Sequence, residues 1–186
     1  ALGLRLALPF PLCMGFPSSL LTMYQLLFRR LFLLQRLMYQ LDSVPWAAKG
    51  PNSVPVMAHF VRSVLGAYLW YLEGEVVGPR LRSVQEAVES AEDLQVLERT
   101  HSTALTEAHR EGLMTEAALG NGLAKLEKAA VDLLTSTDTD QVAMDLPKAV
   151  HQLIDGLESL DSSSSVAIRL SDRLKAIMAS FSITSN

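Results

Sequence analysis

The chain has 186 residues, 49% of them hydrophobic and 19% charged, which suits one domain or two small ones with a substantial core and excludes a disordered tail. Aromatic residues make up only 6%, and Gly and Pro number 10 and 8, a composition that favours a helical protein over a β-sandwich or barrel. The net charge of −4 is unevenly distributed: residues 1–82 contain 8 Lys/Arg and 3 Asp/Glu, whereas residues 83–160 contain 5 Lys/Arg and 15 Asp/Glu. The basic stretch is mostly apolar and lacks the dense basic stripe of a duplex-binding protein, so nucleic acid is not the expected partner.

Residues 1–17 are apolar and interrupted by prolines, so we expect an extended or irregular segment. A single basic residue, Arg5, in an apolar run superficially resembles a signal peptide. Pro9 and Pro11 would break the helix that a signal peptide needs, and this argues against secretion. Because the chain opens with Ala1 inside an apolar run, we expect it to be a fragment of a longer protein.

A long helix is predicted from Ser18 and Ser19, which offer an N-cap, to about Leu41. Its apolar residues recur every three or four positions and leave a narrow polar stripe. That stripe consists of Thr22, Gln25, Arg29, Arg36 and Gln40. Each arginine would cost about 2.5–3.5 kcal/mol at a bilayer centre, so we expect a mostly buried helix and no membrane insertion.

Prolines and glycines then mark a loop over residues 43–55. Trp46 lies within it, and we expect its ring to fold back on the core, since a solvent-facing loop seldom needs an indole. The next helix is predicted over residues 56–78, ending before Pro79, which cannot donate a backbone hydrogen bond.

Glu75 falls on the apolar side of that second helix when successive residues are placed 100° apart. A carboxylate in such a place must be protonated, hydrogen-bonded or paired with a cation. We therefore expect a buried ion pair with Arg30 of the first helix, and no catalytic role for Glu75.

Residues 83–90 are read as a short helix, and Ser90 followed by Asp93 is a variant capping box that begins a longer helix to about Met114. His101 lies on the apolar stripe of this otherwise acidic helix. We expect a hydrogen-bonded core histidine at this position.

The C-terminal part is predicted to hold three more helices, over residues 116–134, 146–160 and 166–181, with polar linkers at 136–145 and 161–165. The middle helix has a strict four-three alternation of apolar residues, which indicates packing along a partner helix. Its members are Leu146, Val150, Leu153, Leu157 and Leu160. The expected fold is all-α, an irregular bundle of about six helices that forms part of a larger elongated helical domain.

No motif indicates an enzyme, and we predict neither a cofactor nor a metal. Glu98 and His101 have the Glu-x-x-His spacing of di-iron bundles, but no second copy exists and Glu98 lies off the stripe that holds His101. A nucleophile elbow, a phosphate loop and a dinucleotide fingerprint are missing from the sequence. The single cysteine, Cys13, excludes a disulfide framework and a cysteine-based zinc site, and it fits a reducing compartment.

Several short landmarks follow one another in a fixed order. Leu8-Pro-Phe-Pro-Leu12, which includes Pro11, is followed by Tyr24-Gln-Leu-Leu-Phe28-Arg and by a set of single positions. Those positions are Trp46, Phe60, Tyr68, Glu75, Val76, Pro79 and His101. Their order and spacing resemble the C-terminal domain of the gamma-tubulin complex component family, and within it component 2 most closely. Gly74 departs from the pattern, because the family usually has an aromatic or aliphatic residue before the glutamate.

The resemblance implies a scaffold whose C-terminal domain binds gamma-tubulin, while the components assemble side by side into a template for microtubule nucleation. It implies gamma-tubulin and other components as partners, and a place in the cytoplasm at a microtubule-organising centre such as a centrosome or spindle pole. Residues 1–186 would then be a fragment of that domain, and the motif residues would mainly build its core.

For the partner surface we choose exposed polar positions that solubility alone does not require. These are Arg29, Arg36, Gln40, Arg62 and Glu73. The alternative from another functional class is a peripheral lipid-binding helical protein, which the apolar segment 1–41 with its arginines favours.

Overall fold

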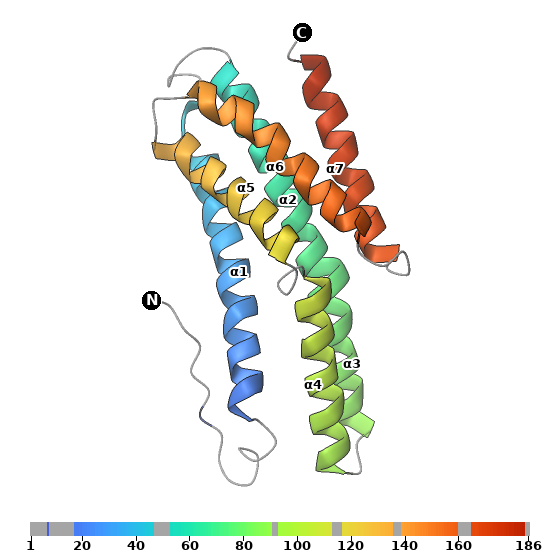
Figure 1. Cartoon of the computed structure of the whole chain (residues 1–186). Helices are drawn as coiled ribbons and strands as arrows, with labels where there is room; N and C mark the ends of the chain where they lie inside the picture. Colours follow the sequence, from blue (N-terminus) through green and yellow to red (C-terminus); the bar gives the residue numbers. More distant parts are fainter. Residues whose placement is uncertain are drawn as a thin grey trace. The chain divides into compact units, whose positions relative to one another are not determined.

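A computed structural model describes residues 7, 17–46, 53–90, 93–112, 117–135, 139–159 and 165–184. Within these ranges the regular structure is helical throughout and contains no strand (Figure 1). The helices are α1 (Ser18–Ser43), α2 (Ser53–Trp70), the π-helix η3 (Tyr71–Val77), α3 (Gly78–Ser90), α4 (Leu94–Glu111), α5 (Ala117–Thr135), α6 (Thr139–Ser159) and α7 (Ser165–Thr184). Since α2, η3 and α3 follow one another without a gap, the described residues form six continuous helices, which confirms the predicted all-α bundle.

The chain divides into two compact units. Unit 1 consists of residues 1–33 and 72–115, and unit 2 of residues 34–71 and 116–186. The predictions for Pro11, Leu12 and Cys13 lie outside the described residues.

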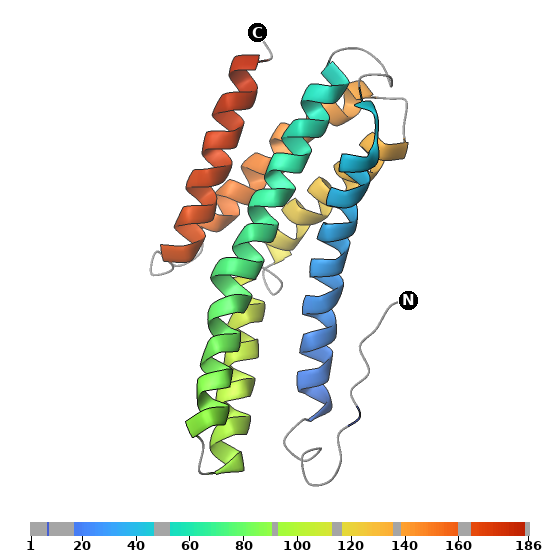
Figure 2. The same cartoon turned by 180° about the vertical axis from the view of Figure 1, so that it is seen from behind.

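Unit 2 has a core of aliphatic side chains from α2, α5, α6 and α7. The helices α5 and α6 lie side by side, and α7 packs against α6 and α2, as Figure 2 shows from the other side. Four of the five residues in the predicted four-three stripe are buried: Leu146, Val150, Leu153 and Leu157. At Gly122 the backbone of α5 lies close to α6, and a Cβ atom there would be 3.5 Å from the Cα of Leu153, an ordinary contact distance. The stripe therefore packs along a partner helix, as predicted.

Unit 1 is built from the first part of α1 together with α3 and α4, which lie side by side (Figure 1). Its described residues bury seven apolar side chains: Leu20, Leu27, Leu72, Val76, Ala104, Leu105 and Ala108. The buried polar side chains of unit 1 are His101 and His109, both from α4. Unit 1 thus combines a small apolar core with polar groups that need hydrogen-bond partners.

The second helix does not end before Pro79, so that prediction is wrong. The backbone changes to π-helical hydrogen bonding over Tyr71–Val77 and returns to the α-helical form at Gly78. Pro79 is therefore the second residue of a new α-helical segment, and proline is best tolerated in the first turn of such a segment.

The same π-helical segment changes the prediction for Glu75. A π-helix has a wider turn than an α-helix, so side chains within it do not follow the 100° spacing used to place Glu75 on the apolar side. The Glu75 side chain is half-buried and not fully buried. Its pairing with Arg30 stays a prediction.

The predicted capping box that begins at Ser90 is not formed, so this prediction is also wrong. Ser90 ends α3, where its hydroxyl donates to the carbonyl of Glu86. Asp93 is the N-cap of α4, and its carboxylate accepts a 3.0 Å hydrogen bond from the backbone N–H of Gln95. A carboxylate in this place satisfies a free N–H and faces the positive end of the helix dipole.

The polar linkers are shorter than predicted. The helix α6 begins at Thr139 and so includes residues 139–145 of the first linker, and α7 begins at Ser165. Val142 is buried, four residues before Leu146, and extends the apolar stripe by one turn. The remaining linker positions lie outside the described residues.

Candidate partner interface

Two histidines of α4 are bonded to the first part of α1. Nε2 of His101 lies 2.5 Å from the hydroxyl of Tyr24, and Nε2 of His109 lies 2.8 Å from the carbonyl oxygen of Met23. Because a carbonyl only accepts, the His109 ring must carry its proton on Nε2 and donate. Burial lowers the pKa of His101 and raises the pKa of Tyr24, so both side chains stay neutral near pH 7. The predicted hydrogen-bonded core histidine at 101 is confirmed, and no pattern considered in the sequence singled out His109.

Arg80 of α3 is held by two carboxylates of α4. One Nη atom lies 3.1 Å from an oxygen of Glu107, and the other lies 2.7 Å from an oxygen of Glu111. Its Nε atom is buried and has no hydrogen-bond partner among the described residues. A buried donor without a partner costs about 1–3 kcal/mol.

A groove with a volume of about 220 Å³ opens within unit 1, and we call it the α3 groove. Its walls come from α1, from Val77 at the end of η3, from α3 and from α4. The lining residues are Tyr24, Leu27, Phe28, Leu31, Val77, Arg80, Leu81, Val84, His101, Ala104, Leu105 and Ala108. The groove is therefore almost wholly apolar, with polar groups only where Tyr24, Arg80 and His101 reach it.

Two residues of the predicted partner surface, Arg29 and Arg36, lie on an exposed stripe along the helix α1. Its members are Leu26, Arg29, Phe32, Arg36 and Tyr39, and we call them the α1 stripe. The side chains of Leu26, Phe32 and Tyr39 are 47%, 40% and 74% exposed. Arginine and aromatic residues are the types most enriched where proteins bind one another. The two arginines predicted from the sequence thus lie among exposed apolar side chains that the prediction did not include.

The other predicted partner residues are placed differently. Arg62 forms an ion pair with Asp42, through its Nε atom and through an Nη atom at 3.3 Å from the second carboxylate oxygen. This pair raises the pKa of Arg62. Gln40 is half-buried and Glu73, in η3, is exposed. Arg62 therefore already has a partner within unit 2.

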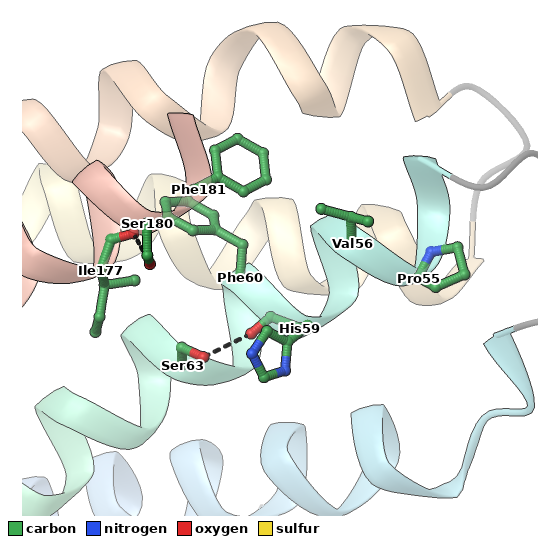
Figure 3. A pocket seen from close by; sticks show the side chains of 8 residues that line it. All are labelled: Pro55, Val56, His59, Phe60, Ser63, Ile177, Ser180 and Phe181. Atoms are coloured by element: carbon green, nitrogen blue, oxygen red, sulfur yellow. Dashed lines mark hydrogen bonds between the residues drawn. The ribbon is translucent and has the colours of Figure 1, made fainter. Parts of the chain in front are cut away.

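A second groove lies between α2 and α7 in unit 2 and has a volume of about 440 Å³ (Figure 3). Its lining is mainly apolar: Pro55, Val56, His59, Phe60, Ser63, Ile177, Ser180 and Phe181. The Phe60 and Phe181 rings are 4.3 Å apart between centroids, and the Ser63 hydroxyl donates to the His59 carbonyl at 2.8 Å (Figure 3). The polar atoms at this groove are thus hydroxyls and a histidine, without a nucleophile and base in contact.

The landmark residues within the described ranges are buried or half-buried. Phe60, Tyr68, Val76 and His101 are buried, and Tyr24, Phe28, Trp46, Glu75 and Pro79 are half-buried. The Trp46 indole turns back on the end of α1, where its Nε1–H donates to the carbonyl of Leu41 at 2.8 Å. The expectation for Trp46 is confirmed.

The part of the chain that the structure describes contains neither a candidate metal site nor a membrane-spanning helix. No group of three or more His, Cys, Asp or Glu side chains there has the arrangement needed to hold a metal ion. None of the described helices combines the length and hydropathy required to cross a bilayer.

A family model described as gamma tubulin complex component C-terminal matches residues 1–184. The chain belongs to this family. Comparison with curated proteins and with solved structures gave no match. Membership confirms the family to which the landmarks pointed, and it makes the chain a gamma-tubulin complex component.

Proposed function

We propose that this chain is a gamma-tubulin-binding scaffold and not an enzyme. The observation that carries the proposal is the family match over residues 1–184, nearly the whole chain. The α1 stripe supports it, because two exposed arginines among exposed Leu26, Phe32 and Tyr39 suit a protein partner. Binding of this kind works by surface complementarity and needs no catalytic group.

The finer parts of this proposal extend the family assignment. Within the family the landmarks most resemble component 2. We propose gamma-tubulin and other components of the complex as partners, and the cytoplasm at a microtubule-organising centre as the location. In the assembled complex the chain would hold gamma-tubulin in position for microtubule nucleation.

The test is a pull-down of purified gamma-tubulin with the chain and with the double variant Arg29→Glu/Arg36→Glu. We expect the variant to lose at least about tenfold in affinity, because arginine is enriched among the few interface residues that contribute about 2 kcal/mol or more, and about 1.4 kcal/mol corresponds to a tenfold change. The matched control is Arg99→Glu/Lys128→Glu, which makes the same change in net charge at two exposed positions on other helices, α4 and α5. Equal loss in both double variants would contradict the α1 stripe, and no binding by the unmodified chain would contradict the proposed function.

The lipid-binding alternative gains nothing from the structure. Five leucines of α1 are buried and so cannot insert into a membrane surface, which leaves only the three apolar residues of the α1 stripe exposed: the buried ones are Leu20, Leu27, Leu34, Leu37 and Leu41. Vesicles of anionic phospholipid in place of gamma-tubulin supply the comparison. Binding to vesicles without binding to gamma-tubulin would favour the alternative.

A further inference from the structure

Two serines of the sequence follow an arginine at a distance of three residues. They are Ser83, after Arg80, and Ser102, after Arg99, and every other serine and threonine has neither Lys nor Arg at that distance. Many protein kinases carry carboxylates that bind an arginine three residues before the serine, and this charge pattern is one way in which they select substrates. The sequence spacing therefore makes both serines candidates for phosphorylation and does not distinguish between them.

The structure distinguishes the two serines by their burial. Ser83 is exposed on α3, a helix in which no residue is buried. Ser102 is half-buried on α4, next to the buried His101 and three residues before the buried Leu105. A kinase reads its substrate as an extended peptide, so the helix around the serine must open first, and segments with few buried contacts open most easily. Of the two serines, Ser83 thus combines the arginine spacing with a helix that opens at low cost.

The arginine before Ser83 also links α3 to α4. Its two Nη atoms lie 3.1 and 2.7 Å from carboxylate oxygens of Glu107 and Glu111, and its Nε–H has no acceptor among the described residues. Residues three apart on a helix are neighbours, so a group attached to Ser83 can reach the Arg80 side chain. A phosphate carries a charge of about −1.5 to −2 and three acceptor oxygens, and it can bind an arginine through Nε together with one Nη. A phosphate on Ser83 therefore competes with the two glutamates for Arg80.

We propose that Ser83 is a phosphorylation site for an arginine-directed protein kinase, and that the phosphate releases Arg80 from α4. In the reaction, Oγ of Ser83 attacks the γ-phosphorus of ATP, the bond from that phosphorus to the bridging oxygen breaks to release ADP, and the hydroxyl proton passes to a carboxylate of the kinase. Glu107 and Glu111 then lose the cation that they share. Glu86, three residues after Ser83, is repelled by the new charge. Phosphorylation thus weakens the contact of α3 with α4.

This inference does not depend on gamma-tubulin, so its tests and that of the proposed function fail independently. The first experiment incubates the folded full chain with ATP and, separately, with calcium/calmodulin-dependent protein kinase II and with the catalytic subunit of cyclic-AMP-dependent protein kinase. Mass spectrometry should find Ser83 phosphorylated at least about tenfold faster than Ser102, because opening α4 exposes buried side chains and opening α3 exposes none. Ser83→Ala should remove most of the incorporated phosphate, whereas Ser102→Ala should leave it unchanged. Equal rates at the two serines, or no phosphate at Ser83 with either kinase, would overturn the proposal.

Synthetic peptides of residues 76–90 and 95–109 separate the effect of burial from that of the neighbouring sequence. Each contains one of the two serines with its arginine, outside the folded chain. The difference in rate should disappear between the peptides. A difference as large as in the folded chain would contradict the argument from burial.

The second experiment measures what the phosphate does to the contact between α3 and α4. Amide hydrogen exchange in α3 should be at least about threefold faster after phosphorylation of Ser83, because the ion pairs of Arg80 no longer hold α3 to α4. Exchange in α5 and α6, which belong to unit 2, should not change and provides the internal reference. Arg80→Gln, which removes the cation without a phosphate, should speed exchange in α3 to a similar extent. Unchanged exchange in α3 after complete phosphorylation would contradict the release of Arg80.

Discussion

The core of unit 2 consists almost entirely of aliphatic and aromatic side chains, whereas unit 1 buries two histidines and the Nε atom of an arginine. In unit 2 the helices α5, α6 and α7 pack through leucines and alanines, which bury a large apolar surface but make no directional interactions. In unit 1 the first part of α1 and α4 are joined by hydrogen bonds from His101 and His109, which are directional. Two units of one helical chain thus use different means to fix their helices.

The difference has a consequence for stability. Apolar burial supplies most of the free energy of folding, so unit 2, with the larger dry core, should be the more stable of the two. Both tryptophans, Trp46 and Trp70, belong to unit 2, so their fluorescence reports its unfolding, while the far-ultraviolet signal reports the helices of both units. The two measurements together separate the units in one denaturation experiment.

Removing a leucine from each core should show the largest effect. Leu153 is fully buried in unit 2, and its replacement by Ala should cost about 4 kcal/mol of unfolding free energy, since the loss leaves an enclosed cavity. Leu105→Ala in unit 1 should cost about 2 kcal/mol, because Leu105 borders the α3 groove and its removal only widens an existing space. Urea unfolding monitored by both signals gives the two values, and equal costs would show that the cores are equally closed.

The same Gly→Ala change should have opposite signs in the two units. A Cβ atom at Gly78 would lie 2.9 Å from the backbone carbonyl oxygen of Glu73, so the π-helical turn must distort, at a cost of about 1–2 kcal/mol. At Gly122 the nearest atoms are 3.5 Å away, an ordinary contact, and alanine should stabilise α5 by up to about 1 kcal/mol. The measurement is again the urea midpoint. A stabilising Gly78→Ala would mean that the close approach to Glu73 does not persist in solution.

Sequence periodicity predicted most of the helices because each buries one side over several turns. It predicted α1, α5 and α7 within a few residues, and it placed His101 correctly on the buried side of α4. It missed the π-helical segment, because a change of hydrogen-bond register leaves no periodic signal and Pro79 looked like a helix end. It also predicted a polar linker where the first turns of α6 lie. Val142, four residues before Leu146, could have indicated that the apolar stripe of the helix begins earlier.

The candidate surfaces were less predictable than the helices. Arg29 and Arg36 could be chosen because a polar stripe on an otherwise apolar helix is visible in the sequence. The ion pair of Arg62 with Asp42 joins residues 20 positions apart, and the α3 groove joins α1 to α3 and α4, so neither is visible in local spacing. Long-range contacts of this kind depend on how helices pack.

The smallest expected effect is a pH dependence specific to unit 1. Burial lowers the pKa of His101 in the folded chain below its ordinary value of 6.5. Between pH 6.5 and that lower pKa the unfolded chain binds a proton that the folded chain does not, so the free energy of unfolding falls as the pH is lowered through this range. Above pH 6.5 both states are neutral at this residue, and its contribution is constant.

Replacing His101 with Phe removes this titration while keeping a ring beside Tyr24. Urea unfolding followed by far-ultraviolet circular dichroism between pH 5 and 8 should give a flatter pH dependence for His101→Phe than for the unmodified chain. Glu158, whose pKa is lowered by its hydrogen bond to Lys175, titrates below this range and does not contribute. An identical slope in the two proteins would show that His101 is as free to take up a proton in the folded chain as in the unfolded one, and the polar contact between α1 and α4 would then be open to water.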